Sequence, residues 1–127
     1  MLVERSISDQ ALETARAVAE KTEVGQADIE GRQIGPVVSE TQFNKIQYLI
    51  KRGIDEHATL IAGGLEHPDG LNRGHFVRPT IFADVTPEMT IWKEEIFGPV
   101  LTMTPFDSEE EAIALANDTP YGLTNYV

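Results

Sequence analysis

The sequence predicts an α/β fold with a layered, largely parallel sheet and flanking helices. Segments with apolar residues at helical spacing alternate with short, continuously apolar segments, which are typical of buried parallel strands. The chain has 127 residues, which is enough for one hydrophobic core and too few for two. We therefore expect one domain over residues 1–127.

Three helices are predicted, and each is opened by a capping box, in which a serine precedes an acidic or amide residue by three positions. The boxes are Ser6 with Asp9, Ser39 with Gln42, and Ser108 with Glu111. Apolar residues follow at helical spacing: Ala11, Leu12, Ala15, Val18 and Ala19; Phe43, Ile46, Leu49, Ile50 and Ile54; and Ala112, Ile113, Leu115 and Ala116. Pro120 ends the third helix.

Short apolar or β-rich segments between the helices predict strands. They cover residues 2–3, 58–62, 76–77 continuing through Arg78-Pro79 into 80–82, 100–104, and 123–127. The first and last of these strands stand at the two ends of the chain. Because natural domains usually begin and end in exposed linkers, we expect this domain to be truncated at both ends.

The charge and composition exclude several functions. The formal net charge of −11 opposes binding to nucleic acid or anionic membranes. No apolar run approaches the roughly 20 residues that span a bilayer, and the charged N-terminus does not resemble a signal peptide, so we expect a cytoplasmic protein. The chain has no cysteine, which removes disulfides, thiolate metal ligands and a cysteine nucleophile.

Two other kinds of site are disfavoured by spacing. The histidines at 57, 67 and 75 lack the close spacing of metal ligands, and we expect no metal site. The glycines at 63, 64, 70 and 74 do not form a dinucleotide-binding G-x-G-x-x-G loop and indicate turns.

The segment Lys93-Glu94-Glu95-Ile96-Phe97-Gly98-Pro99-Val100 resembles the E-E-x-F-G-P signature of the NAD(P)-dependent aldehyde dehydrogenase superfamily. Flanking segments resemble the same family in the same order: residues 34–39, 62–64 and 74–80 upstream, and 105–107, 116–118 and 121–123 downstream. Residues 24–33 depart from the family because they lack its Asp-Pro turn pattern, so the resemblance does not predict the conformation of this loop.

The resemblance implies the activity of the complete enzyme. In this family an active-site cysteine attacks the aldehyde, hydride passes to the nicotinamide of NAD or NADP, and an activated water releases the carboxylic acid. Residues 1–6 resemble the strand after the nucleophile loop. The chain therefore resembles a part of the catalytic domain downstream of the cysteine, the oxyanion donor and the general base. We expect no catalytic residue in it and no turnover by it alone.

The resemblance also assigns two cofactor-binding residues. Glu95 matches the carboxylate that accepts hydrogen bonds from the nicotinamide ribose hydroxyls, a role that suits an ionised carboxylate. Phe97 matches the aromatic residue that packs near the nicotinamide. The alternatives are a surface acid for Glu95 and an ordinary core aromatic for Phe97. Trp92 has no family role and is expected to pack structurally.

Three hypotheses for the chain remain open. The first is an inactive portion of an aldehyde dehydrogenase, and the second is a non-catalytic binding or interaction module derived from that family. A complete small nucleotide-binding domain is disfavoured because no phosphate-binding loop is present. The family is usually homo-oligomeric, and unpaired strand edges and apolar faces predict that the isolated chain self-associates.

Overall fold

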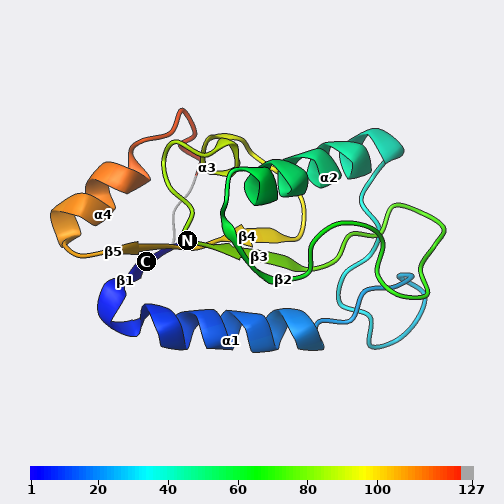
Figure 1. The fold of residues 1–127 in the computed structure, drawn as a ribbon. Helices are drawn as coiled ribbons and strands as arrows, with labels where there is room; N and C mark the ends of the chain where they lie inside the picture. The colour runs from blue at the N-terminus through cyan, green and yellow to red at the C-terminus, as the bar shows by residue number, and fades with distance from the viewer. Residues whose placement is uncertain (124–127) are drawn as a thin grey trace.

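The computed structural model describes residues 1–123. A sheet lies in the middle of the molecule, with α1 against one face and α2 against the other (Figure 1). The elements are β1 (Leu2–Glu4), the 3₁₀-helix η1 (Arg5–Ile7), α1 (Ser8–Lys21), α2 (Glu40–Asp55), β2 (Thr59–Ala62), β3 (Thr80–Ala83), α3 (Thr90–Lys93), β4 (Val100–Thr102), β5 (Thr104–Phe106) and α4 (Glu109–Ala116). No helix in residues 1–123 is both long and apolar enough to cross a membrane.

The strands confirm a mixed but largely parallel arrangement. β3 pairs with β4 and β1 pairs with β5 in parallel, whereas β2 pairs antiparallel with β3. Only Met103 separates β4 from β5, and its backbone N–H donates to the carbonyl of Phe82 at 2.8 Å. Next to the β1 strand, the α-ammonium of Met1 donates to the carbonyl of Thr102, the last residue of β4, at 2.7 Å. These bonds join the two sheets into one layer.

The main core lies between α2 and the sheet. α2 buries Ile46, Leu49 and Ile50 against Phe82 and its neighbours, because its apolar residues recur at helical spacing on one face. Gly53 of α2 leaves room for α3 and β3, since a Cβ there would lie 2.9 Å from Ile91 Cδ1 and 3.1 Å from Phe82 Cζ. A smaller cluster of Val3, Ile81 and Met103 lies on the α1 side of the sheet.

The predicted helix starts are partly correct. Ser39 caps α2 and Ser108 caps α4, each accepting a hydrogen bond from a backbone N–H three residues later. The capping box predicted at Ser6 and Asp9 is wrong. Ser6 lies in η1 and donates to Glu4 Oε1 at 2.6 Å, and α1 begins at Ser8 without a side-chain cap. The short helix α3 was not predicted.

The apolar stripe predicted for the third helix does not become a buried face. None of the residues of α4 is buried, and Ile113 is 54% exposed. In the described residues, α4 contacts only β5 to any extent, as its position beyond the end of the sheet in Figure 1 shows. The helix forms as predicted, while its apolar residues remain accessible.

The strand predictions also need correction. Residues 76–77 are buried but form no strand, so this stretch becomes a strand only from Thr80 onward. The strand predicted for 100–104 is broken at Met103. Of the strand predicted for 123–127, Leu123 lies in a bend, and residues 124–127 lie outside the described residues.

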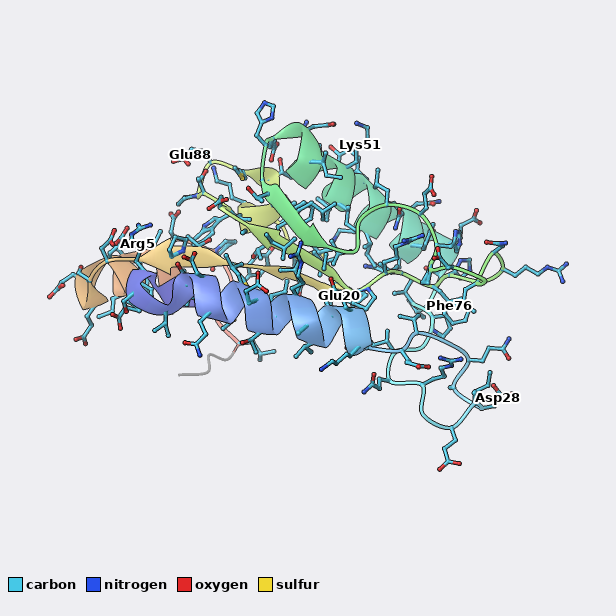
Figure 2. The ribbon with its side chains drawn as sticks, turned by 60° about the horizontal axis from the view of Figure 1, so that its bottom comes forward. Arg5, Glu20, Asp28, Lys51, Phe76 and Glu88 are labelled. Carbon is cyan, nitrogen blue, oxygen red and sulfur yellow. The ribbon has the colours of Figure 1, made fainter. Side chains whose placement is uncertain are left out.

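The loop without the expected turn pattern folds back on itself. The N–H of Gly25 donates to the carbonyl of Ile34 at 3.0 Å, and a parallel bridge joins Val24 with Ile34. Arg32 forms an ion pair with Glu23 across the base of the loop. Asp28 lies near the tip, away from the helices and the sheet (Figure 2).

Candidate functional site

The loop of residues 94–99 connects α3 with β4 and alternates between exposed and buried side chains. Ile96 is buried in the α2 core, with 7% of its surface exposed, whereas Glu95 and Phe97 on either side of it are exposed. Burial of Ile96 anchors the middle of the loop, since an apolar side chain of this size gains about 2 kcal/mol from leaving water. Both predicted cofactor-binding residues therefore stand on an anchored segment with their side chains accessible.

Side chains of α2 hold the backbone of this loop. Gln42 Nε2 donates to the carbonyls of Ile96 at 3.1 Å and Phe97 at 3.0 Å. Lys45 Nζ donates to the carbonyl of Glu95 at 2.9 Å. Because these two donors are three residues apart on a helix, they share one face and reach consecutive carbonyls. The sequence indicates only a capping role for Gln42 and gives no local signal for the role of Lys45.

Phe97 adopts a backbone conformation that is rare for its residue type. Its φ is +56°, in the left-handed region that bulky residues seldom occupy without surrounding contacts that impose it. Its side chain is 70% exposed, so the interpretation of Phe97 as an ordinary core aromatic is wrong. A strained backbone that presents an exposed aromatic is typical of binding sites rather than of packing.

Gly98 and Pro99 complete the turn into β4. A Cβ at Gly98 would lie 2.5 Å from Ile46 Cδ1, so any larger residue would require the buried Ile46 side chain of α2 to move. The carbonyl of Pro99 accepts from the N–H of Thr80 at 2.9 Å, which begins the pairing of β4 with β3. The loop is thus fixed both to α2 and to the sheet.

A cavity of about 650 Å³ opens beside the loop. Its lining comes from α3, the loop, β4 and residues 121–123, and includes Trp92, Glu95, Phe97 and Tyr121. The backbone N–H of Glu95 donates to the Tyr121 hydroxyl oxygen at 3.3 Å. Within the part of the chain that the structure describes, the Glu95 carboxylate takes part in no ion pair or hydrogen bond. Its oxygens are available to a ligand.

Glu56, at the C-terminal end of α2, forms hydrogen bonds with Thr90 in α3, the helix just before the loop. Glu56 accepts hydrogen bonds from the backbone N–H and the hydroxyl of Thr90, both at 2.7 Å, and pairs with Arg52. The Thr90 hydroxyl bond lowers the pKa of the Glu56 carboxyl below its usual 4.5, assisted by the Thr90 N–H and Arg52 and opposed by burial. Glu56 is therefore ionised at neutral pH.

Trp92 and His67 pack against other side chains of the chain. Trp92 packs against the α2 core, as expected, although its Nε1 is buried without a hydrogen-bond partner in residues 1–123. The ring of His67 stacks on Phe43 with centroids 4.6 Å apart. Among the described residues, no group of three or more histidine and carboxylate side chains lies close enough to hold a metal.

A larger groove of about 770 Å³ lies on the other face of the sheet, between α1 and strands β3 and β4. It is lined mainly by apolar side chains, among them Ile7, Ala15, Val18 and Leu101. No carboxylate lines it, and neither Glu95 nor Phe97 reaches it. Despite its size, this groove contains neither predicted cofactor-binding residue and is not the candidate site.

The comparison with protein families decides the identity of the fold. The model of the aldehyde dehydrogenase family matches residues 1–127. The chain belongs to the aldehyde dehydrogenase family. The resemblance drawn from the E-E-x-F-G-P motif is confirmed, and the loop with Glu95 and Phe97 is the segment of this chain that carries the motif.

Solved structures of aldehyde dehydrogenases share this fold. The Bartonella henselae enzyme is 60% identical with a TM-score of 0.97, over 99% of this chain and 26% of that one. The Pseudomonas syringae enzyme AldC, a cysteine-to-alanine mutant complexed with NAD+ and octanal, is 41% identical with a TM-score of 0.94, over 97% of this chain and 25% of that one. The Mycobacterium tuberculosis enzyme complexed with NAD+ is 46% identical with a TM-score of 0.92, over 96% of this chain and 25% of that one.

The chain corresponds to a limited part of these proteins. A curated relative from Staphylococcus epidermidis is 46% identical over 127 residues, which is 100% of this chain and 27% of that protein. The chain thus spans about a quarter of the length of the relatives that it matches.

Proposed function

We propose that this chain is a segment of an NAD(P)-dependent aldehyde dehydrogenase, which oxidises an aldehyde to a carboxylic acid, and that it supplies the cofactor-contacting loop of residues 94–99. One observation carries this proposal. The anchored loop presents two side chains close together: the Glu95 carboxylate, which has no hydrogen-bond or ion-pair partner among the described residues, and the exposed Phe97 with its strained backbone. The complexes of the Pseudomonas syringae and Mycobacterium tuberculosis enzymes with NAD+ support a nicotinamide cofactor.

The side chains of the loop suit the ribose and nicotinamide of such a cofactor. The Glu95 carboxylate can accept from two neighbouring hydroxyls at once, because each of its two oxygens is an acceptor with two lone pairs. Phe97 can pack its exposed ring beside the nicotinamide and restrict its movement. The cofactor supplies hydride acceptance, and the residues of this chain supply orientation.

We propose that the isolated chain is catalytically inactive. The family's reaction requires a thiolate nucleophile, and the sequence contains no cysteine. We therefore assign no catalytic residue to this chain. The prediction is that the purified chain reduces neither NAD nor NADP when an aldehyde is added. Sustained reduction that co-purifies with the chain through successive chromatographic steps would contradict it.

The cofactor role is tested by titrating the purified chain with NADH and following Trp92, the only tryptophan. Trp92 lines the same cavity as Glu95, so bound NADH should quench its emission and receive its energy. We expect Glu95→Gln to weaken binding about tenfold, the equivalent of one charge-assisted hydrogen bond. The matched control is Glu109→Gln, which removes the same charge from an exposed position in α4 outside the cavity and should leave the affinity unchanged.

Equal weakening by both substitutions would reduce the role of Glu95 to general electrostatics. Absence of saturable NADH binding by the wild-type chain would mean that the loop binds a cofactor only within a longer protein. That outcome would favour the alternative, a non-catalytic module, for the chain on its own.

A further inference from the structure

Glu56 lies at the C-terminal end of α2, and its carboxylate faces α3 rather than solvent. Its side chain is 21% exposed, compared with 47% for the adjacent Asp55, which pairs with Lys51. Figure 2 shows Lys51 on the outer side of α2. Two neighbouring acids at the end of one helix therefore have different surroundings. Within residues 1–123, Asp55 pairs only with Lys51 of the same helix, whereas Glu56 also accepts hydrogen bonds from Thr90 of α3.

The Glu56 carboxylate provides hydrogen-bond acceptors for the first turn of α3. This helix has four residues, and its N-cap residue Met89 provides no side-chain hydrogen bond. The open N–H of Thr90 donates instead to Glu56 Oε2, and the Thr90 hydroxyl donates to Oε1. A four-residue helix makes too few internal hydrogen bonds to be stable alone, so its position depends on contacts of this kind.

α3 leads directly into the cofactor loop. The N–H of Glu94, which ends α3, donates back to the carbonyl of Thr90 at 2.9 Å. Glu95 is the next residue, and its backbone is held by Lys45 and Tyr121. A displacement of the first turn of α3 would therefore reach the start of the loop through one hydrogen bond and one helical turn.

We propose that Glu56 is a positioning residue for the cofactor loop, acting through Thr90 to fix α3 and thereby the backbone that presents Glu95 and Phe97. This inference rests on the proposed function of the loop. α2 would then hold the segment of residues 90–97 at two places, with Gln42 and Lys45 near its N-terminus and Glu56 at its C-terminal end. Glu56 touches no cofactor itself, and its effect on binding is indirect.

The test compares Glu56→Ala with the matched control Asp55→Ala, using amide chemical shifts of the purified chain by NMR. Both variants remove one acid from the end of α2, but only the first removes the bonds to Thr90. We expect the amide resonances of residues 94–97 to move in Glu56→Ala and to stay in place in Asp55→Ala. Shifts confined to Thr90 and the end of α2 in a folded Glu56→Ala variant would overturn the proposal.

Two milder variants keep the test decisive where Glu56→Ala does not fold. Glu56→Gln keeps the shape of the side chain but removes its charge. Thr90→Val keeps the backbone N–H donor and removes the hydroxyl, which donates to Glu56 and accepts from Arg52 Nη2 at 3.3 Å. Each should move the same loop resonances by a smaller amount, in the same direction. Unmoved loop resonances in both folded variants would contradict a positioning role.

NADH affinity separates this inference from the proposed function. In a folded Glu56→Ala variant we expect binding to weaken about three- to tenfold, a loss of the size that one hydrogen bond produces. Unchanged affinity of that variant beside a wild-type chain that binds would overturn the proposal. If the wild-type chain binds no NADH, the proposed function of the isolated chain fails, and the loop resonances alone decide the role of Glu56.

Discussion

The two long helices cover opposite faces of one sheet, yet they are packed very differently. α2 buries Ile46, Leu49 and Ile50 almost completely, whereas α1 has no buried residue and leaves Val18 60% exposed. Both helices have apolar residues at helical spacing, so the difference does not come from amphipathicity. It comes from what the rest of the described chain places against each helix.

On the α2 side, the sheet, α3 and residues 94–99 close around the helix. On the α1 side, the groove beside β3 and β4 remains open. The closed side also carries the side-chain contacts of α2 with this region: Gln42 and Lys45 donate to the backbone of the cofactor loop, and Glu56 accepts from Thr90 in α3. The buried face of α2 is thus covered by other parts of the described chain, whereas the groove beside α1 is open to another polypeptide.

The largest expected effect follows from truncating one apolar side chain on each face. Ile50→Ala should destabilise the chain by about 2–5 kcal/mol, because a fully buried side chain leaves a cavity. Val18→Ala should cost less than about 0.5 kcal/mol, because most of this side chain is already in water. Urea denaturation followed by circular dichroism measures both. Equal losses would mean that the groove on the α1 side closes in solution.

A smaller effect is expected from adding a methyl group on the closed side. Gly53→Ala places a Cβ 2.9 Å from Ile91 Cδ1 and 3.1 Å from Phe82 Cζ. We expect a net loss of about 1–2 kcal/mol, since overpacking outweighs the gain in helix propensity. Gly35→Ala is the control, because a Cβ at Gly35 meets no atom within 4 Å. A stabilised Gly53→Ala variant would show that α2 and α3 separate easily.

The helix caps give the next comparison. Ser39 accepts a hydrogen bond from the N–H of Gln42 at 3.2 Å at the start of α2, whereas Ser6 caps no helix. Ser39→Ala should therefore lower the free energy of unfolding by about 1 kcal/mol. Ser6→Ala should change it by only a few tenths. The same denaturation measurement applies, and a larger loss for Ser6→Ala would restore the predicted cap of α1.

Local patterns predicted most of the elements, and their failures have identifiable causes. Ser39 and Ser108 stand in extended backbone and cap their helices as the spacing indicated. Ser6 fails because residues 5–7 first form a 3₁₀ turn, while Arg5 reaches across to a bidentate pair with Asp107 at 2.5 and 2.7 Å. That long-range pair leaves no trace in the local sequence.

The difference between local patterns and long-range contacts also explains which parts of the site could be predicted. The motif around Glu95 identified the loop, because its residue types are contiguous and recognisable. The α2 side chains that contact the loop or α3 come from residues 42–56, between 34 and 55 positions earlier than their partners, and their spacing resembles that of any amphipathic helix. Only the packing of α2 over this region brings Gln42 and Lys45 to the loop and Glu56 to α3. The exposed stripe of α4 was unpredictable for a related reason, since periodicity identifies an apolar face but not whether anything covers it.

The smallest effect on stability, and the most direct test of the open face, is a change in association. We expect the isolated chain to self-associate through the groove beside α1, because exposed apolar surface of this extent favours contacts between chains. Val18→Gln should weaken association measured by sedimentation velocity while leaving the unfolding transition almost unchanged. Val38→Gln is the neutral control, since Val38 is 89% exposed but lies outside the groove. A wild-type chain that stays monomeric at every concentration, with a sharp two-state melt, would show that the open face needs no partner.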